Sequence, residues 1–257
     1  MDISAVVITL NDEKRLGAAL SSLDGIASEI LVVDCGSTDG TVKVAAKYTA
    51  ALHERPGTDP TAQKNWALSL ASSPWILTLA PHETVSSPLR DELIALKAGS
   101  PDCAAFSIPA RTFYLGRWLR HSGWAPGRRV RLFQKGLAHW EDEVVRERLV
   151  VNGAVRNLRG PVHRFPYATI SAHAARLNRD SDMAAHKLYG LKKRARFARL
   201  LLAPAAVFFK TYILRLGILD GYPGLVIAGL DGYSSFLRLA KLREIWKKGE
   251  RIEPFPD

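Results

Sequence analysis

The sequence has few cysteines and no long apolar segment of the kind that crosses a membrane. Its two cysteines, Cys35 and Cys103, are too few for a disulfide framework and fit no zinc-binding pattern. The apolar run 200–209 has ten residues, whereas a membrane-spanning helix needs about 20. The N-terminus leads straight into an apolar segment, without the pattern of a signal peptide. These absences predict a cytoplasmic protein.

Nucleic-acid-binding motifs are also missing, although the chain is basic. The formal net charge is +11; residues 1–100 contain 8 Lys and Arg and 12 Asp and Glu, whereas residues 101–257 contain 28 and 13. A basic half predicts an anionic partner, which is a nucleic acid, a phosphorylated glycolipid or an anionic membrane. Because no helix-turn-helix, zinc-finger, RRM or KH signature accompanies the charge, we expect no nucleic-acid partner.

The first 41 residues predict a strand, a helix and a second strand, with polar residues after each strand. The apolar strands are 5–10 and 30–33, and a helical pattern at 16–23 lies between them. Residues 11–13 (Asn-Asp-Glu) follow the first strand, and residues 34–41 (Asp-Cys-Gly-Ser-Thr-Asp-Gly-Thr) follow the second. Ligands of open parallel sheets bind beyond the carboxyl ends of the strands. We therefore expect two acid-rich loops to line one crevice.

The glycines of this region do not form either common phosphate loop, G-x-G-x-x-G or G-K-[ST]. Gly36 and Gly40 permit tight turns instead. Carboxylates accept hydrogen bonds from an imide N–H or from ribose hydroxyls, so an acid-lined crevice suits the base and ribose of a nucleotide. The alternative, a generic strand–helix–strand unit with solvated turn acids, fits the spacing equally well.

The rest of the chain divides into a mixed α/β region and a helical region. Helices are predicted at 41–50, 62–72 and 87–98, strands at 52–54, 75–79, 104–113 and 130–134, and a hairpin around Asn152-Gly153. From residue 169 to about 247 the pattern is helical, with breaks at Pro204 and at 221–224. We expect an α/β domain over 1–165 and a basic helical region over 166–257.

Several motifs resemble those of family 2 glycosyltransferases. The opening segments are Thr9-Leu10-Asn11-Asp12-Glu13 and residues 32–41. Later segments resemble the bacterial lipopolysaccharide-core branch of that family, in family order and over nearly the whole chain: 63–66, 75–77, 114–118, 121–124, 131–133, 147–149 and 219–222. The resemblance implies a GT-A-like, Rossmann-like mixed sheet flanked by helices, with a C-terminal helical region. It also implies an inverting enzyme that takes a sugar from a nucleotide-sugar donor.

The resemblance assigns roles to particular residues. The nucleoside would be held by Asp34 and Asp39 together with Thr9, Asn11 and Glu13. Lys64 would contact the diphosphate. An inverting transfer needs a base that deprotonates the acceptor hydroxyl, and Glu147 lies where the family places it, with Asp142 and Glu143 as alternates. The family commonly has His-Glu at this point, whereas this chain has Arg146-Glu147.

The chain departs from the family at the metal motif. Where the family has Leu-Asp-Ala-Asp-Glu, this sequence has Leu79-Ala80-Pro81-His82-Glu83. One interpretation is that His82 and Glu83 bind Mn or Mg in another way. A second is metal-independent transfer with arginines at the diphosphate, for which Arg128, Arg129 and Arg131 are available. A third is a degenerate protein that binds nucleotide sugar or glycan without transfer. We favour active transfer, because the other motifs are intact.

The basic half suggests where the acceptor binds. Trp118, Trp124 and Trp140 lie near a group of arginines between 111 and 131, which suits a phosphorylated saccharide; core tryptophans beside a solvated rim are the alternative. Lys and Arg at 192–199 precede the apolar run, which suits a helix in a membrane interface or a helix packed on the catalytic domain. The resemblance implies a lipopolysaccharide-core or related glycolipid acceptor. We expect a cytoplasmic enzyme, peripheral on the cytoplasmic face of the inner membrane.

Overall fold

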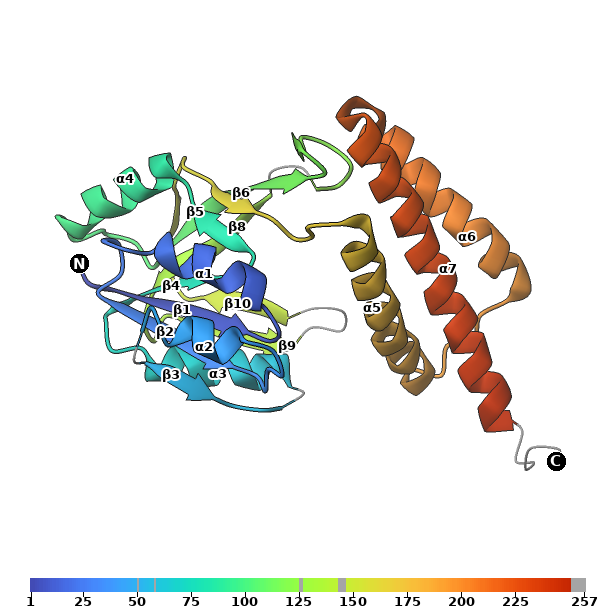
Figure 1. Cartoon of the computed structure of the whole chain (residues 1–257), viewed down its shortest axis with the longest axis horizontal. Helices are drawn as coiled ribbons and strands as arrows, with labels where there is room; N and C mark the ends of the chain where they lie inside the picture. Colours follow the sequence, from blue (N-terminus) through green and yellow to red (C-terminus); the bar gives the residue numbers. More distant parts are fainter. Residues whose placement is uncertain (50, 58, 125–126, 143–146, 251–257) are drawn as a thin grey trace. The chain divides into compact units, whose positions relative to one another are not determined.

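The computed structural model describes residues 1–49, 51–57, 59–124, 127–142 and 147–250 (Figure 1). The chain forms two compact units. The first comprises Met1–Arg111 and Pro126–Phe165, and the second comprises Thr112–Ala125 and Pro166–Asp257. The first unit is an α/β body, whereas the second consists mainly of helices. The segment 112–124 leaves the α/β body along one strand and belongs to the helical unit.

The α/β unit is built on a mixed sheet whose strand order is β3-β2-β1-β4-β8-β6-β12-β5. Strands β3, β2, β1 and β4 are parallel, whereas β8 runs antiparallel to both β4 and β6. A separate pair, β9 and β10, is antiparallel. The strands of the sheet and this pair are β1 (Ile3–Thr9), β2 (Glu29–Asp34), β3 (Leu52–Glu54), β4 (Trp75–Leu79), β5 (Glu83–Val85), β6 (Ala105–Tyr114), β7 (Arg117–Trp118), β8 (Arg128–Gln134), β9 (Ala138–Asp142), β10 (Glu147–Val151), β11 (Val155–Asn157) and β12 (Val162–Arg164).

Helices cover both faces of the parallel strands, which explains why β1, β2 and β4 consist mostly of apolar residues. Successive side chains of a strand point to opposite faces. Val7 therefore shares a core cluster with Leu16 of α1, whereas Val6 lies in another cluster with Leu68 of α3. The helices of this unit are α1 (Glu13–Ser21), α2 (Thr41–Ala45), α3 (Pro60–Leu70) and α4 (Ser87–Lys97). Two of them have a capping side chain and a proline in the first two positions: Asp59 and Pro60 for α3, and Ser86 and Pro88 for α4.

The helical unit places α7 (Tyr222–Glu250) against both α5 (Ile170–Gly190) and α6 (Phe197–Phe209). A π-helical turn, η1 (Lys210–Leu214), and a 3-10 turn, η2 (Gly217–Asp220), join α6 to α7. A small core of Tyr114, Leu119 and Ile227 ties the segment 112–124 to α7. The mixed sheet flanked by helices and the C-terminal helical region agree with the architecture that the resemblance implies.

Two local predictions were wrong. No hairpin forms at Asn152-Gly153, because β11 leaves β10 and pairs in parallel with β6. Gly153 has a φ of +133° and passes so close to Ala104 that a Cβ atom would lie 2.7 Å from the alanine Cβ. Pro204 does not break the helix, since α6 is continuous through it.

The apolar run 200–209 also understates the length of its helix. The helical chain continues through Lys210 as η1. Together, α6 and η1 form an 18-residue helical segment, Phe197–Leu214. Its mean hydropathy is 1.5, and 6% of the segment is buried. By length and composition this segment is able to cross a membrane.

Candidate active site

The loop after β2 is organised by the carboxylate of Asp34, which is 1% exposed. The backbone N–H groups of Gly36 and Ser37 donate to its Oδ2 at 3.0 and 2.7 Å, and the Ser37 hydroxyl donates to Oδ1 at 2.5 Å. Gly36 has a φ of +96°, a conformation that glycine adopts at little cost. Asp34 therefore shapes the loop from within.

The loops after β1 and β2 are hydrogen-bonded to each other. The Asn11 N–H donates to Ser37 Oγ and the Thr38 N–H donates to Asn11 Oδ1, both at 2.8 Å. The Glu13 N–H donates to Asp39 Oδ2 at 3.3 Å, and the Gly40 N–H donates to the Glu13 carboxylate at 3.2 Å. Four predicted nucleoside contacts, Asn11, Glu13, Asp34 and Asp39, are thus brought together at one end of the parallel strands.

The predicted nucleoside contacts differ in how accessible their side chains are to a ligand. Asn11, Glu13 and Asp39 are exposed. Burial raises the pKa of Asp39, but the Thr41 hydroxyl and N–H donate to its carboxylate and bring the pKa below its usual value. Thr9 is instead buried, and its hydroxyl donates to Asp12 at 3.5 Å. Thr9 therefore lies beneath the crevice.

Glu83 lies in a buried ion cluster close to the end of β4. Its Oε1 accepts from Arg131 Nη2 at 2.7 Å and from Arg164 Nε at 3.0 Å, while Oε2 accepts from the Ala80 N–H at 3.1 Å. Burial alone would raise the pKa of Glu83, but Arg131 and then Arg164 hold it below the usual value. One carboxylate between two guanidinium groups leaves this cluster with a net positive charge.

His82 precedes this cluster in the turn between β4 and β5. Burial lowers its pKa to about 4, with Glu83 acting in the opposite direction. The imidazole is therefore neutral at physiological pH. Its backbone oxygen accepts from the Phe165 N–H at 2.8 Å.

These residues do not fit a divalent cation. Both Glu83 oxygens already accept hydrogen bonds, two of them from cationic guanidinium groups. Ala80 and Pro81 offer no side-chain ligand. Over the described parts of the chain, no group of three or more His, Cys, Asp or Glu side chains is placed to hold a metal ion. The predicted ligands His82 and Glu83 are neighbours, but their surroundings favour an anion over a cation.

The motif Gln63-Lys64-Asn65 on α3 connects three parts of the site. Gln63 Nε2 donates to the backbone oxygens of Arg55 and Gly57 at 3.2 and 2.9 Å, and its Oε1 is 3.4 Å from Cys35 Sγ. The Asn65 side chain exchanges two hydrogen bonds with the backbone of Trp140, at 2.7 and 2.8 Å. This motif therefore connects β9 with the loops that follow β2 and β3.

Lys64 lies between Gln63 and Asn65 in the sequence and contacts Glu147 and Trp140. Its Nζ is 3.2 Å from Glu147 Oε2 at the start of β10, and 4.2 Å from the centroid of the Trp140 ring. Both members of the ion pair are partly exposed. The predicted diphosphate contact and the predicted base thus meet side by side.

The alternates to Glu147 are placed differently. Asp142 accepts from the Thr61 hydroxyl at 2.5 Å at the start of α3, which gives it a structural role. Glu143 and Arg146 lie outside the described residues. Of the arginines predicted for the diphosphate, Arg131 belongs to the Glu83 cluster, whereas Arg128 donates to the backbone oxygens of Ser107 and Leu158.

The three tryptophans do not belong to one group. Trp140 lies in the α/β unit under Lys64. Trp124 belongs to the helical unit, where it packs with Tyr114, Tyr167 and His173. Burial raises the pKa of Tyr114 to about 12 and lowers that of His173 to about 4. Trp124 is therefore part of an aromatic core, as the alternative interpretation expects.

Sequence reasoning missed the role of Asp220, which is 2% exposed. Its carboxylate accepts from the N–H groups of Arg120 and His121, both at 3.0 Å, and from the Ser122 hydroxyl at 2.7 Å. Desolvation opposes ionisation, but these donors hold the pKa of Asp220 below its usual value. Two motifs about 100 residues apart, 114–124 and 219–222, are therefore a single structural unit.

Comparison with known proteins agrees with this arrangement. A family model described as Glycosyl transferase family 2 matches residues 4–156. The chain is 30% identical over 251 residues to the lipopolysaccharide core biosynthesis glycosyltransferase LpsC of Rhizobium meliloti (strain 1021), covering 94% of this chain and 92% of that protein. It is 27% identical over 263 residues to the uncharacterized glycosyltransferase RT0209 of Rickettsia typhi, covering 97% of this chain and 89% of that protein.

Among solved structures, S. aureus TarS 1-349 aligns with a TM-score of 0.48 at 15% identity, covering 98% of this chain and 93% of that one. The family match spans more than half of the chain, and the LpsC match spans nearly all of it. The predicted GT-A-like fold class is confirmed, and the chain belongs to glycosyl transferase family 2, a family of glycosyltransferases.

Proposed function

We propose that this glycosyltransferase moves a sugar from a nucleotide-sugar donor, with inversion, to a lipopolysaccharide-core or related glycolipid acceptor. The observation that carries the proposal is the likeness to LpsC over almost the whole length of both proteins. The donor assignment rests on the two hydrogen-bonded loops at the carboxyl ends of β1 and β2, where an open parallel sheet binds its ligands. Both cysteines are free thiols, which suits a reducing cytoplasm.

The nucleoside would lie against the exposed oxygens of Asn11, Glu13 and Asp39. These groups accept hydrogen bonds from the base and the ribose hydroxyls. Asp34 and Thr9 would act from below by fixing the shape of the loops. Donor affinity would then depend on Asp34 even though its carboxylate oxygens already accept three hydrogen bonds within the loop.

The diphosphate would be neutralised by protein cations. The Glu83 cluster carries two arginines for one carboxylate, and guanidinium groups bind phosphate oxygens bidentately. Lys64 would supply a further positive charge. Because the surroundings of His82 and Glu83 do not fit a divalent cation, we propose that transfer proceeds without one.

Glu147 would act as the base. As the acceptor oxygen attacks C1 of the donor sugar, the bond from C1 to the diphosphate oxygen breaks and the hydroxyl proton passes to the Glu147 carboxylate. Attack from the side opposite the leaving nucleoside diphosphate inverts the configuration at C1. Glu147 Oε2 lies 3.2 Å from Lys64 Nζ, which would place the base next to the proposed diphosphate contact.

Turnover of a panel of nucleotide sugars with purified lipopolysaccharide-core acceptors tests this function. We expect Glu147→Gln to lower kcat by roughly 10²–10⁴-fold while the donor affinity remains within a factor of about two. The conservative change Asp142→Asn is the matched control and should leave kcat much less affected. Equal losses in both variants, or full activity of Glu147→Gln, would show that Glu147 is not the base.

A second candidate is donor binding without transfer, which the altered metal motif favours. It predicts that the chain binds a nucleotide sugar in calorimetry and that no acceptor releases nucleoside diphosphate. Turnover that depends on Glu147 excludes it.

A further inference from the structure

Apart from Arg199 in its first turn, helix α6 consists of apolar side chains on every side. Leu200, Pro204 and Val207 are half-buried on one side, whereas Leu201, Leu202 and Phe209 are 59, 69 and 61% exposed. None of the residues of α6 is buried. A surface helix of a water-soluble domain normally has a polar outer side, and a helix that is apolar all round is covered by other apolar material.

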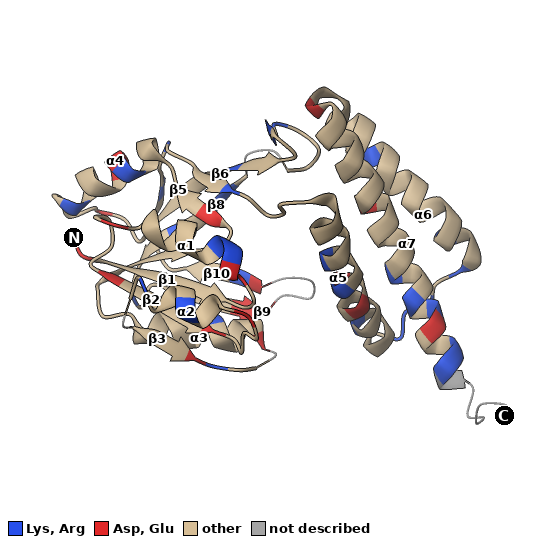
Figure 2. Cartoon of the chain, viewed as in Figure 1, with Lys and Arg blue, Asp and Glu red and all other residues tan. Residues whose placement is uncertain are grey.

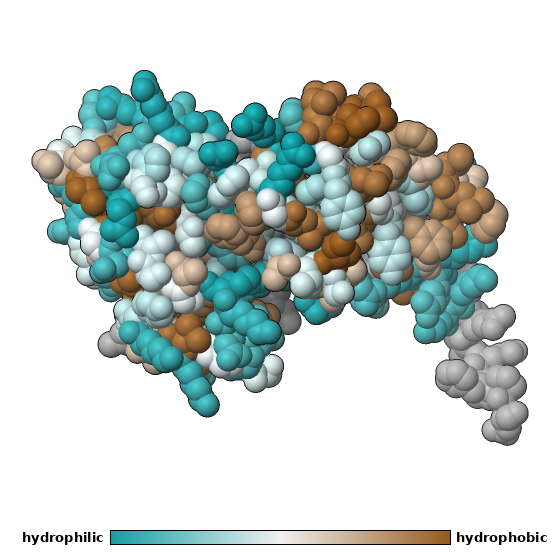
Figure 3. Space-filling view, turned by 45° about the horizontal axis from the view of Figure 1, so that its top comes forward, coloured by the Kyte–Doolittle hydropathy of each residue, from teal (hydrophilic) through white to brown (hydrophobic). Residues whose placement is uncertain are grey.

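The exposed apolar surface continues beyond α6. Its members lie in α6, η1, η2 and the start of α7, and we call them the apolar face: Leu201, Leu202, Phe209, Ile213, Leu214, Ile218, Leu219, Tyr222 and Leu225, each at least 45% exposed. Figure 3 shows strongly hydrophobic residues gathered over the helical unit. Large contiguous apolar patches on a protein surface mark sites of interaction.

The charged residues from residue 183 to residue 219, a range that includes α6, are all basic. The sequence has no acidic residue between Asp182 and Asp220, but eight Lys and Arg. Six of them precede or begin α6, and Figure 2 shows α6 itself almost without charge. The basic loop between α5 and α6, residues 191–196, is fixed to Trp246 of α7. The indole N–H of Trp246 donates to the backbone oxygen of Lys193 at 2.8 Å, and the Arg194 guanidinium lies 4.6 Å from the centroid of the Trp246 ring.

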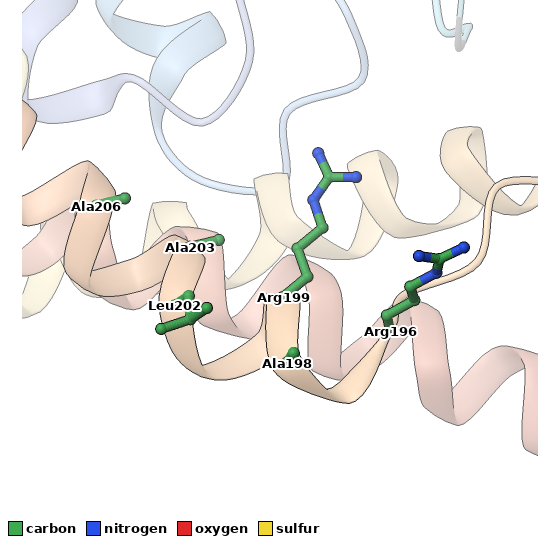
Figure 4. A pocket seen from close by; sticks show the side chains of 6 residues that line it. All are labelled: Arg196, Ala198, Arg199, Leu202, Ala203 and Ala206. Carbon is green, nitrogen blue, oxygen red and sulfur yellow. The ribbon is translucent and has the colours of Figure 1, made fainter.

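A shallow groove joins the basic and apolar parts. Arg196 and Arg199 border it, and its remaining lining is Ala198, Leu202, Ala203 and Ala206 (Figure 4). Two guanidinium groups beside small apolar side chains match an amphiphile that carries a phosphate next to hydrocarbon. This combination is the chemistry of an anionic phospholipid at a bilayer surface.

We propose that the helical unit docks on an anionic bilayer, with the apolar face inserted at the level of the headgroups and Arg196 and Arg199 on lipid phosphates. A helix in the interface needs an apolar side and cationic flanks, both of which are present. Helices α6 and α7 would not cross the bilayer, because α7 packs along α6 and carries Asp231 and Arg238. A second copy of the chain would present the same positive charge and be repelled.

Vesicle flotation of the full chain, without donor or acceptor, tests the proposal independently of turnover. We expect binding to phosphatidylglycerol–phosphatidylethanolamine vesicles and little binding to phosphatidylcholine vesicles. The double variant Leu202→Asp/Phe209→Asp should bind at least ~10-fold more weakly. The matched control is Ile94→Asp, which changes an exposed apolar residue of α4 in the α/β unit and should bind as the wild type does.

A second pair of variants tests the arginines. Arg196→Glu/Arg199→Glu should weaken binding by ~30-fold or more, because each cation near an anionic surface contributes severalfold. Lys43→Glu/Lys47→Glu causes the same change in net charge on α2 and the residues after it, and should have a much smaller effect. Circular dichroism of each variant confirms that it is folded.

Three outcomes would overturn the proposal: no binding of the wild type to anionic vesicles, equal binding by Leu202→Asp/Phe209→Asp and the wild type, or equal losses in the two charge-reversal variants. A lipid-free dimer by light scattering that Leu202→Asp/Phe209→Asp converts to a monomer would also overturn it, because the apolar face would then be a contact between copies.

Discussion

Each unit of the molecule folds a polar loop around one buried carboxylate. Asp34 in the α/β unit and Asp220 in the helical unit each accept two backbone N–H groups and one serine hydroxyl. The donors of Asp34 are two and three residues away in sequence, whereas those of Asp220 are 98 to 100 residues away. Similar local chemistry thus shapes a short loop in one unit and fastens distant segments in the other.

The two units also differ in the side chains that they expose. The loops around Asp34 present exposed acids and amides, which suits a neutral, hydrogen-bonding ligand such as a nucleoside. The helical unit presents exposed leucine, isoleucine and phenylalanine beside arginine and lysine. Under the two proposals above, the donor binds to the first unit and the membrane to the second.

The largest loss of stability is expected from Asp220→Ala. The change leaves the N–H groups of Arg120 and His121 without their acceptor and frees a segment in which Ser122 has a φ of +61°. We expect the free energy of unfolding to fall by roughly 3 kcal/mol or more, because each orphaned buried donor costs about 1–3 kcal/mol. Urea unfolding followed by tryptophan fluorescence measures it. A loss below about 1 kcal/mol would mean that Asp220 does not fasten the two segments.

Asp34→Ala is expected to lower donor affinity more than it lowers stability, in contrast to Asp220→Ala. The loop that it closes is short, so we expect a loss of about 1–3 kcal/mol in unfolding free energy. Donor binding should fall below detection in calorimetry. Asp34→Asn keeps one oxygen for the N–H groups of Gly36 and Ser37 and should restore part of the affinity. Unchanged affinity in Asp34→Ala would place the nucleotide elsewhere.

The smallest expected effect is the pH dependence contributed by Asp220. Its folded pKa lies below the unfolded value, which is about 3.9. Its stabilisation is therefore complete above that pH and is lost as the pH falls through the folded pKa. Unfolding free energies of the wild type and of Asp220→Asn should converge on acidification. A constant difference between pH 6 and pH 3 would contradict the lowered pKa.

Much of the α/β unit could be predicted from the sequence because its signals are local. The apolar runs of β1 and β2 and the polar residues after them predicted two neighbouring loops, and residues 11–13 and 34–41 do come together. Asn152-Gly153 misled, since a turn signal does not tell which strand the chain joins next; here it is β6. Pro204 misled because packing on α7 keeps α6 continuous.

The parts of the site that could not be predicted depend on residues far apart in sequence. Glu83 receives its arginines from β8 and from the end of β12, 48 and 81 residues later. Lys64 meets Glu147 across 83 residues. No periodicity or motif spacing encodes such pairs, because they arise only when the sheet assembles. The choice between a metal site and an arginine cluster therefore required the structure.

The most direct test of the account is turnover of a nucleotide-sugar donor and a lipopolysaccharide-core acceptor in EDTA, compared with the same reaction in Mg²⁺ and in Mn²⁺. We predict that kcat in EDTA stays within about twofold of its value with either metal, and that Arg131→Ala lowers the donor affinity. A reaction that stops in EDTA and resumes when either metal is added would contradict the assignment of the diphosphate to the arginines around Glu83.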